Sequence, residues 1–120
     1  MNKKILIVDD SKTALLMMKT LFEEESYEVH SAETGQEGVR LSENVHPDII
    51  ILDTILPDID GFEVCKKIKS QSTNNMPKII VMTGSIDAVD ASKAKKSGAD
   101  DYIVKTSDFS YLLNSVKSIV

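Results

Sequence analysis

Five polar residues in this sequence each stand at or directly after the end of a short apolar run. They are three carboxylates, a hydroxyl and an ammonium group: Asp9, Asp10, Asp53, Thr83 and Lys105. A hard cation such as Mg²⁺ suits the carboxylates, because it takes oxygen ligands at roughly 2.0–2.1 Å and usually needs only one or two of them. A carboxylate beside such a cation can attack a phosphoryl group if positive charge neutralises the transferring oxygens. These residue types therefore indicate metal-assisted phosphoryl transfer, provided that the fold brings them together.

Each of the five side chains has a role in that chemistry. Asp53 is the candidate nucleophile, and Asp9 and Asp10 would hold the metal ion. Lys105 would neutralise one phosphoryl oxygen as a mobile point charge, and Thr83 would donate a hydrogen bond to another. The assignments depend on the elements that position these residues.

Apolar runs alternate with amphipathic segments along the whole chain. Five runs have the length and β-branching of strands, at 5–8, 27–32, 48–53, 78–83 and 102–104. A helical pattern follows each of these runs. The first is marked by Ala14, Met17, Met18 and Leu21, the second by a capping box of Thr34 and Glu37, and the third by Phe62, Cys65 and Ile68. The fourth is a segment of small residues at 86–97, and the fifth is marked by Phe109, Leu112, Leu113 and Val116. Strict alternation predicts a doubly wound α/β domain, with five helices around a five-stranded parallel sheet.

The predicted sheet turns these scattered residues into one site. All strands of a parallel sheet point the same way, so the residues at their carboxyl ends gather at one edge, where open α/β folds place ligand sites. Asp9 and Asp10 follow the first predicted strand. The third, fourth and fifth strands end at or just before Asp53, Thr83 and Lys105. We therefore expect all five side chains to converge.

Composition narrows the classes of function. A chain of 120 residues fits one domain with a single core. Its formal net charge of −5 argues against a nucleic-acid or anionic-membrane surface, and we expect neither as a partner. The one cysteine excludes an internal disulfide. Only four apolar residues precede Asp9, too few for the core of a signal peptide, and no apolar stretch is long enough to span a membrane. We expect a cytoplasmic protein.

Four stretches of the sequence carry a family resemblance. Together "ILIVDDS", "PDIIILDTILPDIDGFE", "KIIVMTGS" and "GADDYIVK" resemble the receiver domain of two-component response regulators, chemotaxis regulators among them. The resemblance covers nearly the whole chain and keeps the order and spacing of all five site positions. It implies the flavodoxin-like strand order 2-1-3-4-5.

The same resemblance implies a mechanism and a ligand set. A phosphoryl group would pass from a phosphohistidine, on a histidine kinase or histidine phosphotransfer protein, to Asp53. Mg²⁺ would be held by Asp10, Asp53 and the backbone carbonyl of Ile55, with Asp9 acting mainly through bound water. The family also couples a threonine to an aromatic residue as a switch, here Thr83 and Tyr102.

Two positions depart from the family pattern. Leu56 stands where methionine is most common, a swap of similar volume that should matter little. Thr106 stands where most members have proline, commonly in a cis peptide. A cis bond before a non-proline residue costs roughly 2.5–4 kcal/mol, so we expect the Lys105–Thr106 peptide to be trans.

Several residues have a second, structural interpretation. Asp9 and Asp10, taken alone, are equally suited to capping the helix that follows them. The stretch from Asp58 to Gly61 mimics a paired-aspartate phosphatase motif but lacks the preceding strand, so we interpret Asp60 as a helix cap and Gly61 as part of the first turn. His30 and His46 have no second ligand at metal spacing. Cys65 lies on a predicted core stripe and is expected to pack there.

The sequence thus predicts a phosphorylatable switch: a single receiver domain over residues 1–120, without an output domain. It would not be a conventional enzyme, although it would catalyse its own aspartyl phosphorylation and dephosphorylation. Its weakly anchored helix at 86–97, its fifth strand and its last helix would form the face for an unknown downstream protein. The main alternative is a pseudo-receiver, a constitutive interaction module without phosphotransfer. A phosphatase or flavin-binding protein of the same fold is a weaker third candidate, because the loop after the first strand is acidic.

Overall fold

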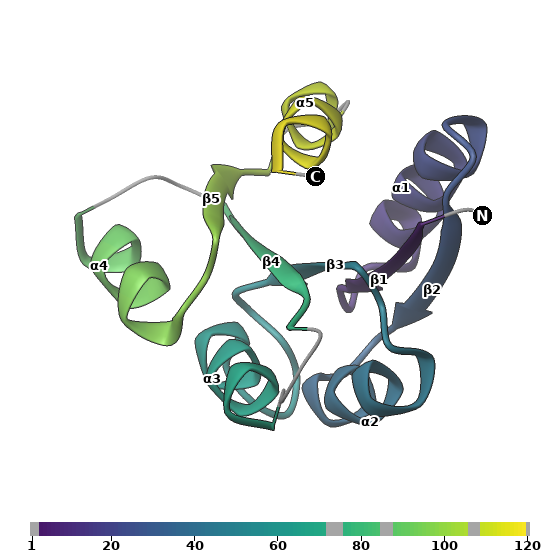
Figure 1. Ribbon diagram of the computed structural model, residues 1–120. Coiled ribbons are helices and arrows are strands. Elements are labelled where there is room, and N and C mark those ends of the chain that lie inside the picture. The colour runs from purple at the N-terminus through teal and green to yellow at the C-terminus, as the bar shows by residue number, and fades with distance from the viewer. Residues whose placement is uncertain (1–2, 72–75, 85–87, 106–108, 120) are drawn as a thin grey trace.

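The computed structural model describes residues 3–71, 76–84, 88–105 and 109–119, and within them it confirms the predicted alternation of strands and helices (Figure 1). The elements, in chain order, are β1 (Lys4–Val8), α1 (Lys12–Glu24), β2 (Glu28–Ala32), α2 (Gly35–Val45), β3 (Ile49–Asp53), α3 (Gly61–Gln71), β4 (Lys78–Thr83), α4 (Ala88–Ser97), β5 (Asp101–Val104) and α5 (Ser110–Ile119). The strands form one parallel sheet in the order β2-β1-β3-β4-β5, as the family resemblance implied.

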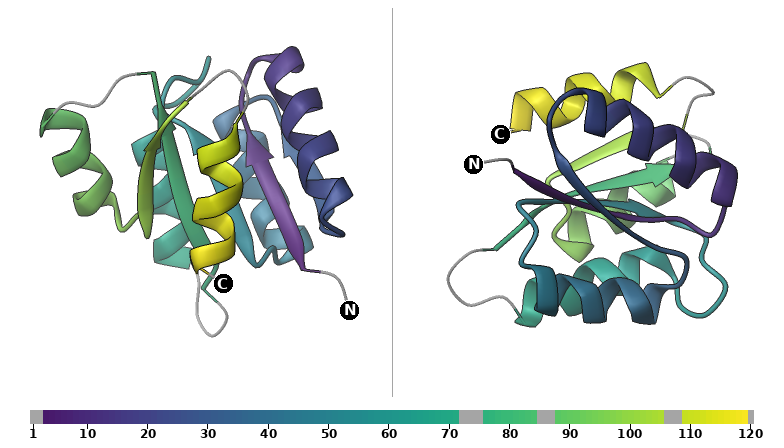
Figure 2. Two further views of the ribbon diagram at one scale, coloured as in Figure 1. Left: turned by 90° about the horizontal axis from the view of Figure 1, so that it is seen from above. Right: turned by 90° about the vertical axis from the view of Figure 1, so that its right-hand side faces the viewer.

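Helices cover both faces of this sheet. Figure 2 shows α1 and α5 on one side and the other helices on the opposite side. Alternate residues of the central strands point to the two faces, so Ile49 and Ile51 pack with α1 and α5 while Ile50 and Leu52 pack with α2 and α3. Every residue of β3 is buried. This two-sided burial explains why the strands read as continuous apolar runs.

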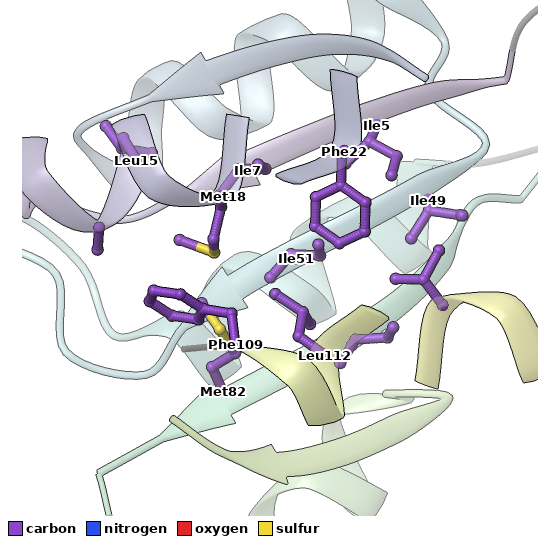
Figure 3. Packing of buried hydrophobic residues seen from close by; sticks show 13 residues of the cluster. Ile5, Ile7, Leu15, Met18, Phe22, Ile49, Ile51, Met82, Phe109 and Leu112 are labelled. Carbon is purple, nitrogen blue, oxygen red and sulfur yellow. The ribbon is translucent and has the colours of Figure 1, made fainter. Parts of the chain in front are cut away.

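The core under α1 and α5 is built from large side chains. Phe22 and Met18 of α1 meet Leu112 of α5 and Phe109, which precedes it, above the strand residues (Figure 3). On α1 the buried stripe is Ala14, Leu15, Met18 and Phe22. Met17, one of the residues that marked the helical pattern, is 43% exposed, because the positions four residues apart, 14, 18 and 22, set the inward face and turn Met17 outward.

Side-chain oxygens cap α2 and α3 at their amino-terminal ends. Thr34 accepts a hydrogen bond from the backbone N–H of Glu37 at 3.1 Å, the contact that a capping box predicts. Asp60 accepts from the N–H of Phe62 at 2.7 Å, so the interpretation of Asp60 as a helix cap is confirmed. The α3 helix begins at Gly61, also as expected. None of the helices within the described residues is long and apolar enough to cross a membrane.

Candidate functional site

The carboxyl edge of the sheet brings the predicted acidic residues together. Val8 and Leu52 are register partners in adjacent strands, so the residues that follow them, Asp9 and Asp53, are neighbours. One carboxylate oxygen from each of Asp9, Asp10 and Asp53 lies within 4.8 Å of the others. Asp9 is fully buried and Asp53 nearly so, whereas Asp10 is exposed. Three carboxylates from two strands thus share one small volume.

Lys105 supplies the positive charge at the centre of this cluster. Its Nζ donates to Asp9 Oδ2 at 2.6 Å and to Asp53 Oδ2 at 3.5 Å, contacts that join residues 96 and 52 positions apart in the chain. Partial burial alone would lower the pKa of Lys105, but the hydrogen bond that Lys105 donates to Asp9 and the charge of Asp53 raise it above its usual value. The ammonium group is therefore a permanent cation at this edge.

The pKa of Asp53 is raised from its ordinary value. Burial is the main cause, the neighbouring Asp9 adds to it, and Lys105 opposes both. A nucleophilic carboxylate that water solvates poorly is a more reactive anion, and a nearby cation favours its charged form. The arrangement favours recruitment of a further positive charge.

Asp9 has both of its carboxylate oxygens engaged by protein donors. Its Oδ1 accepts from the N–H of Ser11 at 2.9 Å, while Oδ2 accepts from Lys105. The cap of α1 is Ser11, whose hydroxyl accepts from the N–H of Ala14 at 3.2 Å. The alternative that Asp9 and Asp10 cap this helix is therefore wrong, because a serine fills that position.

The donor set suits a small hard cation. Two oxygens on one Mg²⁺ lie at most about 4.2 Å apart, twice the usual metal–oxygen distance. A cluster whose oxygens lie within 4.8 Å of one another fits an ion bound directly by some of its carboxylates and through water by the rest. Asp10 and Asp53 are the better direct ligands, because the hydrogen bonds to Asp9, at 2.9 and 2.6 Å, are shorter than those to Asp53, at 3.3 and 3.5 Å.

Asp10→Ala should weaken Mg²⁺ binding, because it removes an exposed anionic ligand without touching the contacts of Asp9. We expect a loss of at least roughly tenfold, since even groups that only orient metal ligands typically cost that much. Without metal, the variant should also unfold at a slightly higher urea concentration than wild type, because the mutation removes one of the mutually repelling negative charges of the cluster. Calorimetric titration with Mg²⁺ measures the first effect and urea unfolding the second.

Glu43→Ala is the matched control, since this exposed residue lies near the end of α2, away from the site edge. It should leave Mg²⁺ affinity unchanged. Equal affinity of wild type and Asp10→Ala would remove Asp10 from the metal site.

The backbone around Asp53 is held by close contacts with α3. The N–H of Ile55 donates to Asp53 Oδ1 at 3.3 Å, and the N–H of Gly61 donates to the carbonyl of Thr54 at 3.0 Å. A Cβ on Gly61 would lie 2.1 Å from the carbonyl oxygen of Asp53. Gly61 was predicted only as part of a helix turn, and its second role, as the surface against which the Asp53 loop rests, was missed.

Thr83 ends β4 at the same edge and is 3% exposed. Its hydroxyl donates to Asp90 Oδ2, in the first turn of α4, at 3.4 Å. The contact of Asp90 with Thr83 was not predicted from the sequence. The signal that could have indicated it is an acidic residue in the first turn of the helix that follows Thr83. Both residues line a cavity of about 260 Å³ that also touches Thr54 and Lys93.

Tyr102 lies on β5, directly beside β4. Tyr102 is the register partner of Val81, and Thr83 is the partner of Val104, so Thr83 and Tyr102 are on the same face of the sheet, two positions apart. Tyr102 is partly buried against the apolar cluster on the α3 side. The register thus places the two residues near one another, and their coupling stays a prediction.

The remaining predictions concern residues outside the acidic cluster. Cys65 is buried in the core, where burial raises the pKa of its thiol, so it packs as expected. His30 contacts Glu28 on β2, and His46 ends α2, both away from the cluster. The Lys105–Thr106 peptide lies outside the described residues, and its expected trans form stays a prediction.

Known proteins share both this fold and its sequence pattern. The chain matches the model of the response regulator receiver domain over residues 5–117, and it therefore belongs to that family. It is similar to the protein PilH of Pseudomonas aeruginosa, with 29% identity over 98% of this chain and 97% of PilH. Among solved structures, the chemotaxis protein CheY4 of Vibrio cholerae superposes with a TM-score of 0.93 at 28% identity, covering 100% of both chains.

Other relatives are longer than this chain. The alkaline phosphatase synthesis transcriptional regulatory protein PhoP of Bacillus subtilis is 38% identical over 88% of this chain, which spans 43% of PhoP. The chain likewise spans 52% of the response regulator ArlR of Staphylococcus aureus at 36% identity. The chain thus corresponds to about half the length of these regulators and to nearly all of PilH.

Proposed function

We propose that this receiver domain is a phosphorylation switch whose phosphoacceptor is Asp53. The observation that carries the proposal is the contact of Lys105 with both Asp9 and Asp53 in a cluster of three carboxylates. Family membership supports a histidine kinase or a histidine phosphotransfer protein, in the cytoplasm, as the phosphoryl donor. A constitutive module would have no need of a nearly buried carboxylate with a raised pKa beside a mobile cation.

In the proposed transfer step, an oxygen of Asp53 forms a bond to phosphorus while the bond between phosphorus and the donor imidazole nitrogen breaks, and the imidazole leaves with the electron pair. Lys105 neutralises one phosphoryl oxygen, and the Thr83 hydroxyl donates to another. Mg²⁺, held by Asp10, Asp53 and the Ile55 carbonyl and reached by Asp9 through water, would supply further neutralising charge.

Incubation of the protein with Mg²⁺ and acetyl phosphate, followed by intact mass measurement, tests this function. We expect one phosphoryl group per chain, and none when a chelator removes Mg²⁺. A protein that stays unmodified with acetyl phosphate and with a panel of histidine kinases would instead support the pseudo-receiver alternative.

The output of the switch is proposed to be a changed protein-binding face on α4, β5 and α5. Phosphorylation adds about −1.5 to −2 charges at the strand edge, and Thr83 lies at the end of the strand beside Asp53. Drawing its hydroxyl toward a phosphoryl oxygen vacates space that the ring of Tyr102, on the same face, can enter. With the ring inward, the proposed partner face loses an aromatic group.

Thr83→Ala should still take up phosphate on Asp53 but should respond weakly around Tyr102. A phosphoryl group can shift an equilibrium only through its different interaction with two states, and the hydroxyl supplies that difference here. Amide spectra of wild type and Thr83→Ala, with and without beryllofluoride, measure the response. The exposed Thr20→Ala on α1 is the matched control and should respond like wild type. Equal responses around Tyr102 in Thr83→Ala and wild type would refute the coupling.

A further inference from the structure

The carboxyl-terminal half of α4 is anchored to the rest of the domain. Ala94 and Ser97 are the buried side chains among residues 90–97, the part of the helix whose side-chain burial the structure describes. The Cys65 thiol of α3 also donates a hydrogen bond to the Ser97 carbonyl at 3.4 Å. Near the other end of the described helix, Asp90 reaches the sheet through its contact with Thr83.

Because Thr83 already donates to Asp90, a phosphoryl group on Asp53 and the Asp90 carboxylate would compete for the same hydroxyl proton. A threonine hydroxyl carries a single O–H donor, which here points to the carboxylate of Asp90. A phosphoryl oxygen on Asp53 would need the same donor. Thr83 is 3% exposed and Asp90 is partly buried, so water compensates only in part the acceptor that loses the hydroxyl.

We propose that Asp90 is a positioning residue that holds the Thr83 hydroxyl in the unphosphorylated protein and so sets how readily the switch turns on. This inference rests on the proposed function. When a phosphoryl group takes the hydroxyl, Asp90 loses this hydrogen bond and stands near a second anion. Both effects push the amino-terminal end of α4 away from the strand edge, and the anchored end acts as the pivot.

The surroundings of Asp90 leave room for that movement. The cavity of about 260 Å³ lies against Thr83, Gly84 and Asp90, and a Cβ on Gly84 would meet nothing within 4 Å. Lys93, three residues after Asp90 on the same helix, lines this cavity too. Residues with this spacing are neighbours on a helix, so the ammonium group of Lys93 can neutralise the released carboxylate.

Asp90→Asn tests the proposal because it keeps the side-chain volume while replacing a charged acceptor with a weaker neutral one. Beryllofluoride with Mg²⁺ is the probe, titrated into the protein and followed by fluorine NMR. We expect Asp90→Asn to bind it roughly fivefold more tightly than wild type, since hydrogen bonds to charged groups are about twice as strong as neutral ones. Asp90→Ala should bind at least as tightly as Asp90→Asn.

A double-mutant cycle separates this role from a general effect of charge. In a Thr83→Ala background the hydroxyl is gone, so Asp90→Asn should no longer change the affinity. The matched control is Glu63→Gln, which makes the same change in net charge on the adjacent α3, where Glu63 is exposed and 3.5 Å from Lys66. It should leave the affinity unchanged.

The outcomes distinguish the two proposals. Wild type that binds no beryllofluoride and takes up no phosphate overturns the proposed function, and this inference with it. Wild type that binds, with equal affinity in Asp90→Asn, overturns the role of Asp90 alone. The same gain in affinity with and without the Thr83 hydroxyl also overturns it, because the effect would then be one of charge.

Discussion

Asp53→Asn should take up no phosphoryl group from acetyl phosphate or from any kinase that labels the wild type. The carboxamide oxygen carries no negative charge with which to attack phosphorus. Asp9 is also buried and lies closer to Lys105, but its oxygens accept short hydrogen bonds of 2.9 and 2.6 Å, whereas those of Asp53 accept longer ones of 3.3 and 3.5 Å. Intact mass and peptide mapping after labelling measure the loss.

The fold should survive this change. The pKa of Asp53 is raised in the folded protein, so the folded state favours the neutral form more than the unfolded chain does. The carboxylate therefore costs stability at neutral pH, and this cost disappears as the pH falls below the unfolded pKa. An uncharged Asn removes it, so the free energy of unfolding of Asp53→Asn should equal or exceed that of wild type at pH 7.

Asp60→Asn is the matched control for Asp53→Asn. It also replaces one carboxylate near the site, while asparagine caps a helix about as well as aspartate. It should be labelled like wild type. Undiminished labelling of Asp53→Asn would move the phosphoacceptor to another residue.

The strand pattern made the architecture predictable. Runs such as Ile49–Leu52 are buried on both faces of a sheet, and this environment leaves a continuous apolar signature that survives in a single sequence. Once the strands are known to be parallel, their ends must share one edge. Asp9, Asp53 and Lys105 could therefore be brought together from the sequence, although 96 residues separate Asp9 from Lys105.

Contacts that depend on how the helices pack against the sheet could not be predicted from the strand pattern. Asp58 accepts from the N–H groups of Gly35 and Gln36 at 2.7 and 2.8 Å, and so caps α2 from a loop more than twenty residues away. No local spacing encodes that contact, because it is set by the packing of α2 beside α3. The hydrogen bond of Asp90 to Thr83 depends in the same way on where α4 lies.

Gly61→Ala should be the most damaging conservative change near the site. The new Cβ would lie 2.1 Å from the carbonyl oxygen of Asp53 and 2.8 Å from the Cα of Thr54, distances that real Cβ atoms essentially never show. Both neighbours are backbone atoms, which cannot rotate away as the end of a side chain can. Inserting a methyl group into packed structure costs about 1–3 kcal/mol, and a contact this short should reach the upper part of that range.

Helix propensity alone predicts that Gly61→Ala raises the free energy of unfolding, whereas the collision predicts that it lowers it, so the measurement distinguishes the two effects. Alanine is about 0.5–1 kcal/mol better than glycine inside a helix, so a Gly61→Ala protein without the collision would be more stable than wild type. Gly84→Ala, where a Cβ meets nothing within 4 Å, is the control and should change the free energy of unfolding by less than about 0.5 kcal/mol. Urea unfolding of both variants gives the comparison.

The same collision should reach the chemistry, because relief can come only from moving α3 or the Asp53 loop. Either movement changes the 3.5 Å separation of Asp53 from Lys105 and the spacing of the three carboxylates. We therefore expect Gly61→Ala to bind Mg²⁺ and beryllofluoride more weakly than wild type under conditions in which it is fully folded. A stable Gly61→Ala protein with wild-type affinity for both would show that α3 does not support the phosphoacceptor loop, and that Asp53 is held by the sheet alone.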